Sequence, residues 1–109
     1  MKRMGKVIGL SAADVVEYKK AHAAVWPEVL RLIRAAGITN YSIYLKEPEN
    51  LLFAYMEYGG TDEAADMAIM AASPEMQRWW AWMEPMQRPL ETRKPGEWWA
   101  DMEEVFHTD

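Results

Sequence analysis

The chain has 109 residues and a formal net charge of −5, and half of its residues are hydrophobic. This length and balance predict one globular domain over residues 1–109. The acidic charge argues against a nucleic-acid-binding protein, and no apolar run reaches the roughly 20 residues of a membrane span. Cysteine is absent, which excludes disulfides, thiolate metal sites and a cysteine nucleophile. The start carries no signal-like apolar stretch, so we expect a cytoplasmic location.

The first third of the chain predicts a strand followed by an interrupted helix. Residues 6–10 have the composition of a short strand, and Ser11 is a candidate N-cap for a helix that begins at Ala12. Pro27 lacks an N–H donor, so we expect a kink or a fresh helical start there. Gly37 is expected to end the second helical piece.

The middle of the chain predicts a hairpin. Residues 38–46 and 51–58 are rich in β-branched and aromatic types, and the turn residues 47–50 separate them. Strict alternation along the first arm places four side chains on one face, which are Thr39, Tyr41, Ile43 and Leu45.

A second helical region and a last strand follow. Thr61 or Asp62 is expected to cap a helix, and Pro74 at a favoured first position restarts it. Three prolines and a glycine predict a long loop over residues 85–97. The tail, residues 102–107, resembles a strand in composition.

The predicted element order is βαββαβ, the ferredoxin-like arrangement of an α+β domain. Its sheet has helices on one face only, and here the bare face carries aromatic side chains. Exposed apolar area of that kind is typical of a ligand site or a subunit interface. We therefore expect a homodimer in which two sheets pack face to face.

His22 is the first candidate for chemistry. Tyr18 lies four positions before it and Trp26 four after, so the three share one helical face. They combine a phenol hydroxyl, a nitrogen that titrates near neutral pH and a flat apolar wall. The alternative is a structural histidine with its hydrogen bonds satisfied.

Other aromatic residues admit two interpretations each. Tyr41 is either a core tyrosine with a partner for its hydroxyl or a pocket residue. Trp79, Trp80 and Trp82 cannot all face one way, because adjacent helical residues differ by roughly 100°. At least one of these rings is expected to face a ligand pocket or a partner chain.

Familiar cofactor and metal motifs are missing. The two histidines, His22 and His107, form no HxH or HExxH pattern, and there is no GxGxxG, P-loop or GxSxG. The residues therefore favour cofactor-free and metal-free acid–base work on a small, neutral, hydroxylated ligand.

Five segments, in order along the chain, resemble the L-rhamnose mutarotase family. They are His22-Ala-Ala-Val-Trp-Pro-Glu28, Asn40-Tyr-Ser-Ile-Tyr-Leu45, Asn50-Leu-Leu-Phe-Ala54, Arg78-Trp-Trp80 and Glu104-Val-Phe106. The resemblance implies a dimeric α+β barrel that interconverts the α and β anomers of L-rhamnose in the cytoplasm without cofactor or metal. Residues 85–99 match no pattern of the family. If this loop closes over the pocket, the preferred sugar can differ from that of the family.

By position, the resemblance implies roles for five residues. His22 matches the proton donor, and the sugar-binding residues are Tyr18, Tyr41, Trp79 and Trp80. The accompanying hypothesis is that His22 donates a proton to the ring oxygen while a tyrosine or water takes the anomeric proton. Two alternatives remain: a cofactor-free monooxygenase on the same fold, and a sugar-binding module without catalysis.

Overall fold

The computed structural model describes all 109 residues. The strands form one antiparallel sheet, and the helices lie on a single face of it. The strands are β1 (Lys2–Leu10), β2 (Ile38–Lys46), β3 (Leu51–Tyr58), β4 (Gln87–Arg88) and β5 (Ala100–Met102). Their order is β2-β3-β1-β4, and β5 also pairs with β1. This order is that of the ferredoxin-like arrangement, and the predicted α+β fold class is confirmed.

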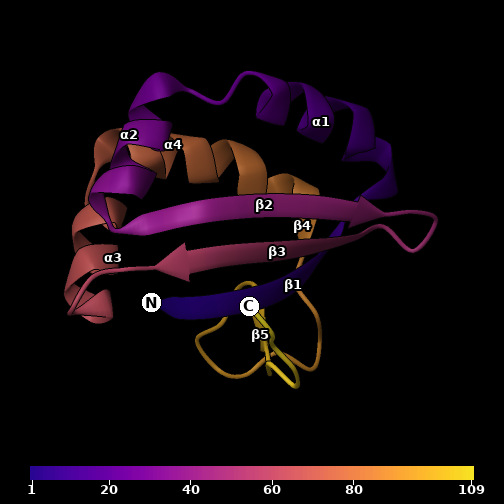
Figure 1. Ribbon diagram of the computed structural model, residues 1–109. Coiled ribbons are helices and arrows are strands. Elements are labelled where there is room, and N and C mark those ends of the chain that lie inside the picture. The colour runs from indigo at the N-terminus through magenta and orange to yellow at the C-terminus, as the bar shows by residue number, and fades with distance from the viewer.

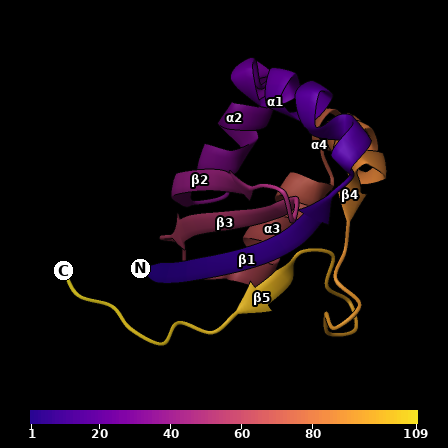
Figure 2. The same cartoon turned by 90° about the vertical axis from the view of Figure 1, so that its right-hand side faces the viewer.

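The helices cover the concave side of the sheet (Figures 1 and 2). They are α1 (Val15–Ala23), α2 (Pro27–Ala35), α3 (Glu63–Ala71) and α4 (Pro74–Met83), with short 3₁₀ turns η1 (Ala12–Asp14) and η2 (Glu84–Met86). In Figure 2, α1, α2 and α4 stand on one side of the sheet, while β5 lies beside β1 at the edge of the sheet away from these helices, and the C-terminal tail runs on from it. None of the helices is long and apolar enough to cross a bilayer.

Single residues in the sequence predicted most of the helix ends correctly. Pro27 is the first residue of a separate helix, Gly37 has a φ of 88°, and the Asp62 side chain accepts a hydrogen bond from the Ala65 N–H at 3.1 Å. Ser11 is an exception, because it makes no side-chain cap bond and a 3₁₀ turn rather than an α-helix follows it. The α-helix begins only at Val15.

Both ends of the chain differ from the sequence expectation. The first strand begins at Lys2 rather than at residue 6, because β1 pairs with β3 along its length. The predicted strand at residues 102–107 is wrong: β5 ends at Met102, and the tail beyond it is exposed. A strand needs a partner, and the free edge of β1 is shared between β4 and β5. The tail is held instead by two hydrogen bonds from Arg3 to Glu104, at 2.8 and 2.9 Å.

The core lies between the sheet and the helices. Its most fully buried side chains are Ile8, Val29, Leu52 and Met76, which come from two strands and two helices. Burial of each such side chain contributes about 1.5–3 kcal/mol. These side chains pack α2 and α4 against the centre of the sheet, and space remains beneath α1.

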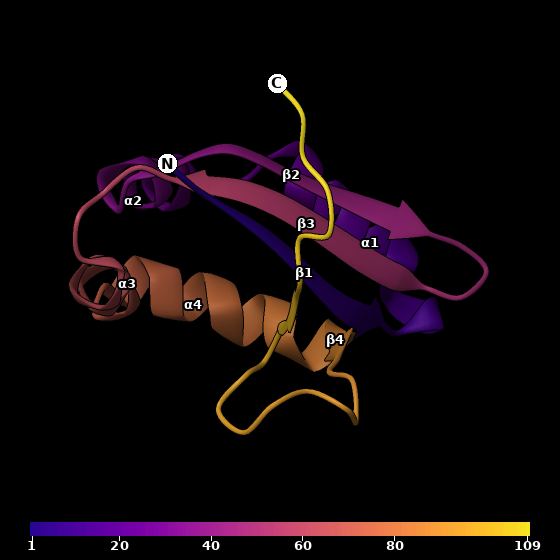
Figure 3. The same ribbon diagram turned by 60° about the horizontal axis from the view of Figure 1, so that its bottom comes forward.

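The opposite face of the sheet carries no helix. Cross-strand pairing aligns Tyr44, Phe53 and Val7 in one row on this outer face. Tyr44 is 67% exposed, and the tail residues Val105 and Phe106 are exposed as well. Figure 3 shows the tail passing over the outer side of β1 and β3. The bare aromatic face predicted from the sequence is therefore present.

Candidate functional site

Two cavities, of about 600 and 320 Å³, lie between the helices and the sheet. Five residues line both of them, and these are Tyr18, His22, Tyr41, Ile43 and Trp79. The smaller cavity is also lined by Trp80. All five site residues predicted from the sequence therefore line this cavity, and these are Tyr18, His22, Tyr41, Trp79 and Trp80. The geometry brings these residues together, whereas their chemical roles remain predictions.

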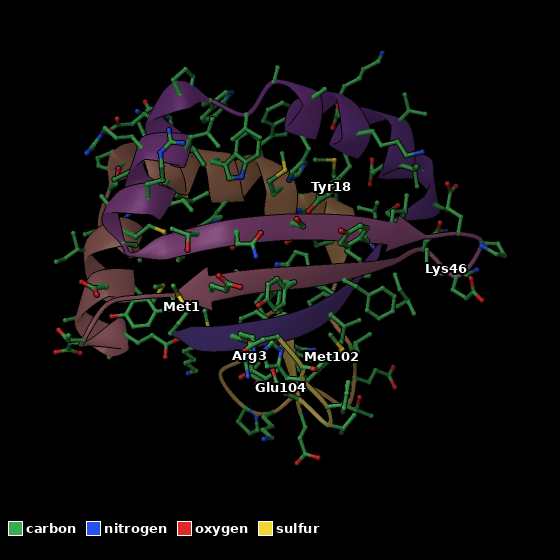
Figure 4. The ribbon with its side chains drawn as sticks, viewed as in Figure 1. Met1, Arg3, Tyr18, Lys46, Met102 and Glu104 are labelled. Carbon is green, nitrogen blue, oxygen red and sulfur yellow. The ribbon has the colours of Figure 1, made fainter.

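Helix α1 presents Tyr18 and His22 to the shared wall. Their rings stack with centroids 4.3 Å apart, and Figure 4 shows Tyr18 directed from α1 toward the sheet. The Nδ1 atom of His22 lies 2.9 Å from the carbonyl oxygen of Tyr18. A carbonyl only accepts, so Nδ1 carries the proton and donates it. The other ring nitrogen, Nε2, is left as the acceptor in the neutral imidazole.

Burial lowers the pKa of His22 below its ordinary value of 6.5, and the hydrogen bond to the Tyr18 carbonyl partly offsets this. The neutral imidazole is therefore the resting form at neutral pH. A free, unprotonated Nε2 beside a cavity is suited to accept a proton from a ligand.

Tyr41 lines both cavities from β2, at a bulge in that strand. The register of β2 on β3 shifts between Thr39 and Ser42, and Asn40 adopts a φ of 49°. Asparagine tolerates this left-handed conformation better than most residues. The Asn40 side chain donates to Glu57 at 3.1 Å, and Asn40 also borders the larger cavity, whereas Tyr41 lines both cavities.

The bulge corrects one expectation from strict alternation. Thr39 pairs with Glu57, which places it on the outer face, whereas Ile43 and Leu45 pack against the core. The shared face of Tyr41, Ile43 and Leu45 is as predicted. The register moves Thr39 off this face, although Thr39 still borders the larger cavity with them. The extra residue changes the phase of the strand between these two parts.

The Tyr41 hydroxyl is a strong candidate donor. Surrounding protein raises the pKa of Tyr41 to about 12, and the nearby Tyr18 adds a smaller contribution. The residue is 38% exposed because the cavity that it lines is open to solvent. Burial also raises the pKa of Tyr18. Both phenols therefore keep their protons at neutral pH.

The tryptophans of α4 divide as the helical geometry requires. Trp79 is buried and meets the His22 ring edge-on, with centroids 5.5 Å apart. Trp80 lines the smaller cavity, and Trp82 leaves the core to stack on Trp26 at 5.8 Å. The expectation that at least one ring faces a pocket is confirmed.

Three further residues of the smaller cavity were missed by sequence reasoning, and these are Gln87, Trp98 and Trp99. The Gln87 side chain is buried, donates to the Tyr18 hydroxyl at 3.1 Å and accepts from the Trp98 indole at 2.8 Å. All three lie in or beside the loop between β4 and β5. The available signal was an adjacent pair of tryptophans in an otherwise polar, proline-containing loop.

The larger cavity extends from the shared wall beneath α2. Most of its lining is apolar, and besides His22 its polar members are Lys19, Arg34, Thr39 and Asn40. No three histidine, aspartate or glutamate side chains gather in a way that could hold a metal ion. The chemistry within reach is therefore proton transfer and hydrogen bonding by an imidazole and two phenols between aromatic walls.

Comparison with known proteins gives a consistent result. The profile of the L-rhamnose mutarotase family matches residues 3–108. An L-rhamnose mutarotase of Lactiplantibacillus plantarum is 38% identical over the full length of both chains. One of Listeria monocytogenes is 35% identical over 98% of each chain. The crystal structure of an L-rhamnose mutarotase from Formosa agariphila superimposes with a TM-score of 0.78 at 26% identity, covering both chains completely.

Proposed function

We propose that this chain, which belongs to the L-rhamnose mutarotase family, interconverts the α and β anomers of L-rhamnose with His22 as its catalytic group. The observation that carries the catalytic assignment is the free Nε2 of His22 on a cavity wall shared with Tyr18 and Tyr41. A neutral sugar offers hydroxyl groups and C–H faces, and the cavity offers matching hydrogen-bond partners and indole rings.

The reaction requires one proton to leave the anomeric hydroxyl and one to reach the ring oxygen. Neutral His22 takes the anomeric proton at Nε2 while the bond from the anomeric carbon to the ring oxygen breaks and an aldehyde forms. The imidazolium then donates the same proton to the ring oxygen. Both oxygens are bonded to one carbon, so a single nitrogen can serve both.

Ring closure reverses these steps on the other face of the aldehyde. After rotation about the bond between the first two carbons, the ring hydroxyl attacks the carbonyl carbon and loses its proton to Nε2. The new anomeric oxygen takes that proton back. No electron is gained or lost, and His22 returns to its neutral form.

The other four residues are proposed to hold the sugar. Tyr18 and Tyr41 keep their protons and so can donate to sugar oxygens. Trp79 and Trp80 offer flat apolar surfaces to the C–H side of the pyranose and to its methyl group. This division leaves His22 as the one imidazole at the cavity wall.

Saturation-transfer proton NMR tests the proposed function. One anomeric proton of L-rhamnose is saturated while the other is observed, with and without catalytic amounts of protein. We expect transfer of saturation only when the protein is present. Binding of the sugar without transfer would show a binding module, and neither binding nor transfer would refute the proposed substrate.

A homodimer formed through the outer face of the sheet is part of the same proposal. The exposed Tyr44 side chain on the outer face, together with exposed Met102 at the end of β5 and exposed Val105 and Phe106 in the tail, supports it. Contiguous apolar area of this kind favours association. A cytoplasmic location, which the family resemblance implies, also belongs to the proposal. Light scattering of the purified chain tests the dimer, and cell fractionation tests the location.

A further inference from the structure

We propose that Gln87 and Trp98 are positioning residues that direct the hydroxyl proton of Tyr18 toward the bound sugar. This inference rests on the proposed function and deepens it. Three segments distant in sequence meet at this point, since Tyr18 belongs to α1, Gln87 to β4 and Trp98 to the loop before β5. The resemblance to the family assigns a role to the first of these residues only.

Trp98, Gln87 and Tyr18 form a chain of two hydrogen bonds, and the Trp98 end shows which atom of each pair donates. The indole nitrogen of Trp98 can only donate, and it lies 2.8 Å from Oε1 of Gln87. That contact distinguishes the oxygen of the amide from its nitrogen. The nitrogen, Nε2, must therefore be the atom that lies 3.1 Å from the Tyr18 hydroxyl.

The orientation of the Gln87 amide determines whether the Tyr18 hydroxyl donates or accepts in this contact. Because Gln87 Nε2 donates, the Tyr18 oxygen accepts, and the proton of Tyr18 is not used in this contact. Tyr18 makes no other side-chain hydrogen bond, and its ring lines both cavities. The phenol proton is thus available to a ligand in the cavity.

Burial holds this arrangement in place. Gln87 is 6% exposed, and each half of its amide has one partner. Turning the amide over would set its NH₂ group against the Trp98 N–H and leave the buried NH₂ group of Gln87 without an acceptor, which is costly. β4 fixes the backbone, because Gln87 pairs with Leu10 of β1.

This arrangement matches the chemistry of the sugar. The ring oxygen of a pyranose carries lone pairs and no hydrogen, so only a donor can recognise it. A Tyr18 hydroxyl with its proton facing the cavity is such a donor. The pair formed by Gln87 and Trp98 therefore selects which oxygen of the sugar lies against Tyr18, although neither residue needs to touch that oxygen.

Two substitutions of Gln87 separate direction from simple packing. Gln87→Glu keeps the shape but places a carboxylate beside Tyr18, which accepts the phenol proton and withdraws it from the sugar. We expect the anomer exchange rate at saturating L-rhamnose to fall about tenfold near neutral pH. Gln87→Met keeps the side-chain volume and leaves the Tyr18 proton free, but nothing then orients that proton. We therefore expect the anomer exchange rate to fall about threefold.

The pH profile gives a readout that a structural role would not move. In Gln87→Glu, a protonated carboxyl can accept from Trp98 and donate to Tyr18, as the amide does. The rate of this variant relative to the unaltered protein should therefore rise as pH falls. Gln77→Glu is the matched control, because Gln77 lies on α4 outside both cavities and bonds only the Ala71 carbonyl.

A double variant tests the chain itself. Trp98→Phe keeps the ring but removes the donor that orients the amide, and should cost about threefold. In the Gln87→Met background, Trp98→Phe should cost little more, because no amide remains to orient. Additive losses, a larger loss in Gln87→Met than in Gln87→Glu, or a pH-independent deficit would each overturn the inference. Circular dichroism and thermal unfolding establish that every variant is folded.

An NMR measurement keeps this inference distinct from the proposed function. The indole N–H of Trp98, assigned by its loss in Trp98→Phe, should be protected from exchange with water, and Gln87→Met should remove that protection. An unprotected indole would overturn the hydrogen-bond chain whatever the activity. A protected indole without any anomer exchange would refute the sugar reaction and with it the role proposed for Tyr18.

Discussion

The two faces of the sheet carry similar aromatic residues in opposite surroundings. Tyr41 on the inner face borders two cavities beneath helices, and its pKa is raised to about 12. Tyr44, three residues later on the same strand, is 67% exposed on the outer face, where it pairs with Phe53. Neither Tyr44 nor Phe53 lines either of the two cavities.

The difference shows that residue type does not decide function in this molecule. The helices on the inner face enclose a space and supply polar partners, so aromatic rings there can bind and orient a small molecule. On the outer face nothing encloses the rings, and only a second surface of similar size can remove them from water. We therefore propose catalysis for the inner face and association for the outer face.

The largest effect is expected from His22→Ala. Loss of a general acid–base group costs about 10²–10⁴-fold in rate, so saturation transfer between the anomers should become undetectable at catalytic protein concentrations. His107→Ala is the matched control, since His107 is exposed and bonds only Asp109. Full exchange activity in His22→Ala would refute the catalytic assignment of the inner face.

The outer face should respond next, and in a different property. Tyr44→Lys places a charge in the proposed interface, and a buried unpaired charge is strongly destabilising. We expect the dimer to weaken at least about a hundredfold by light scattering, with the exchange rate per chain kept within about twofold. Tyr44→Phe should leave both properties unchanged. An unaltered dimer in Tyr44→Lys would show that association occurs elsewhere.

The pH dependence of exchange should report His22. Burial lowers its pKa from 6.5 and the neutral form accepts the first proton, so the rate should reach a plateau at neutral and alkaline pH. Below the lowered pKa, the rate should fall by about tenfold per pH unit as the imidazole becomes protonated. A rate that rises on acidification would instead identify His22 as a donor only, with another group taking the anomeric proton.

The smallest effect compares the two tyrosines directly. Tyr41→Phe removes one neutral hydrogen bond to the sugar and should cost about threefold to tenfold in the exchange rate. The oligomeric state should not change. Tyr44→Phe, the same substitution on the outer face, should have no effect on exchange. Equal effects of the two substitutions would remove the distinction between the faces.

The sequence predicted those features that depend on neighbouring residues. Pro27, Gly37 and Asp62 mark helix ends through their own backbone or side-chain chemistry, and each does so in the structure. The helical spacing of Tyr18 and His22 likewise predicted that their rings would share one face. Local rules suffice where the interacting groups are a turn or less apart.

Features that depend on distant pairing were not predictable in this way. The outer position of Thr39 follows from how β2 registers against β3, and the short β5 follows from competition for one edge of β1. The contact of Gln87 with Tyr18 joins residues 69 positions apart, and no spacing rule relates them. The resemblance to a family named five site residues but was silent on the loop that completes the cavity wall.

The bulge at Asn40 divides β2 into two parts that need not change together. Ile38, before it, is buried in the core as well as bordering the larger cavity, and after it Tyr41, Ile43 and Leu45 continue the wall of that cavity. A length change at this point would rotate every later side chain to the other face while leaving the earlier part in place. Sequence drift in this lineage can therefore exchange one amino acid for another along the wall far more freely than it can add or remove one there.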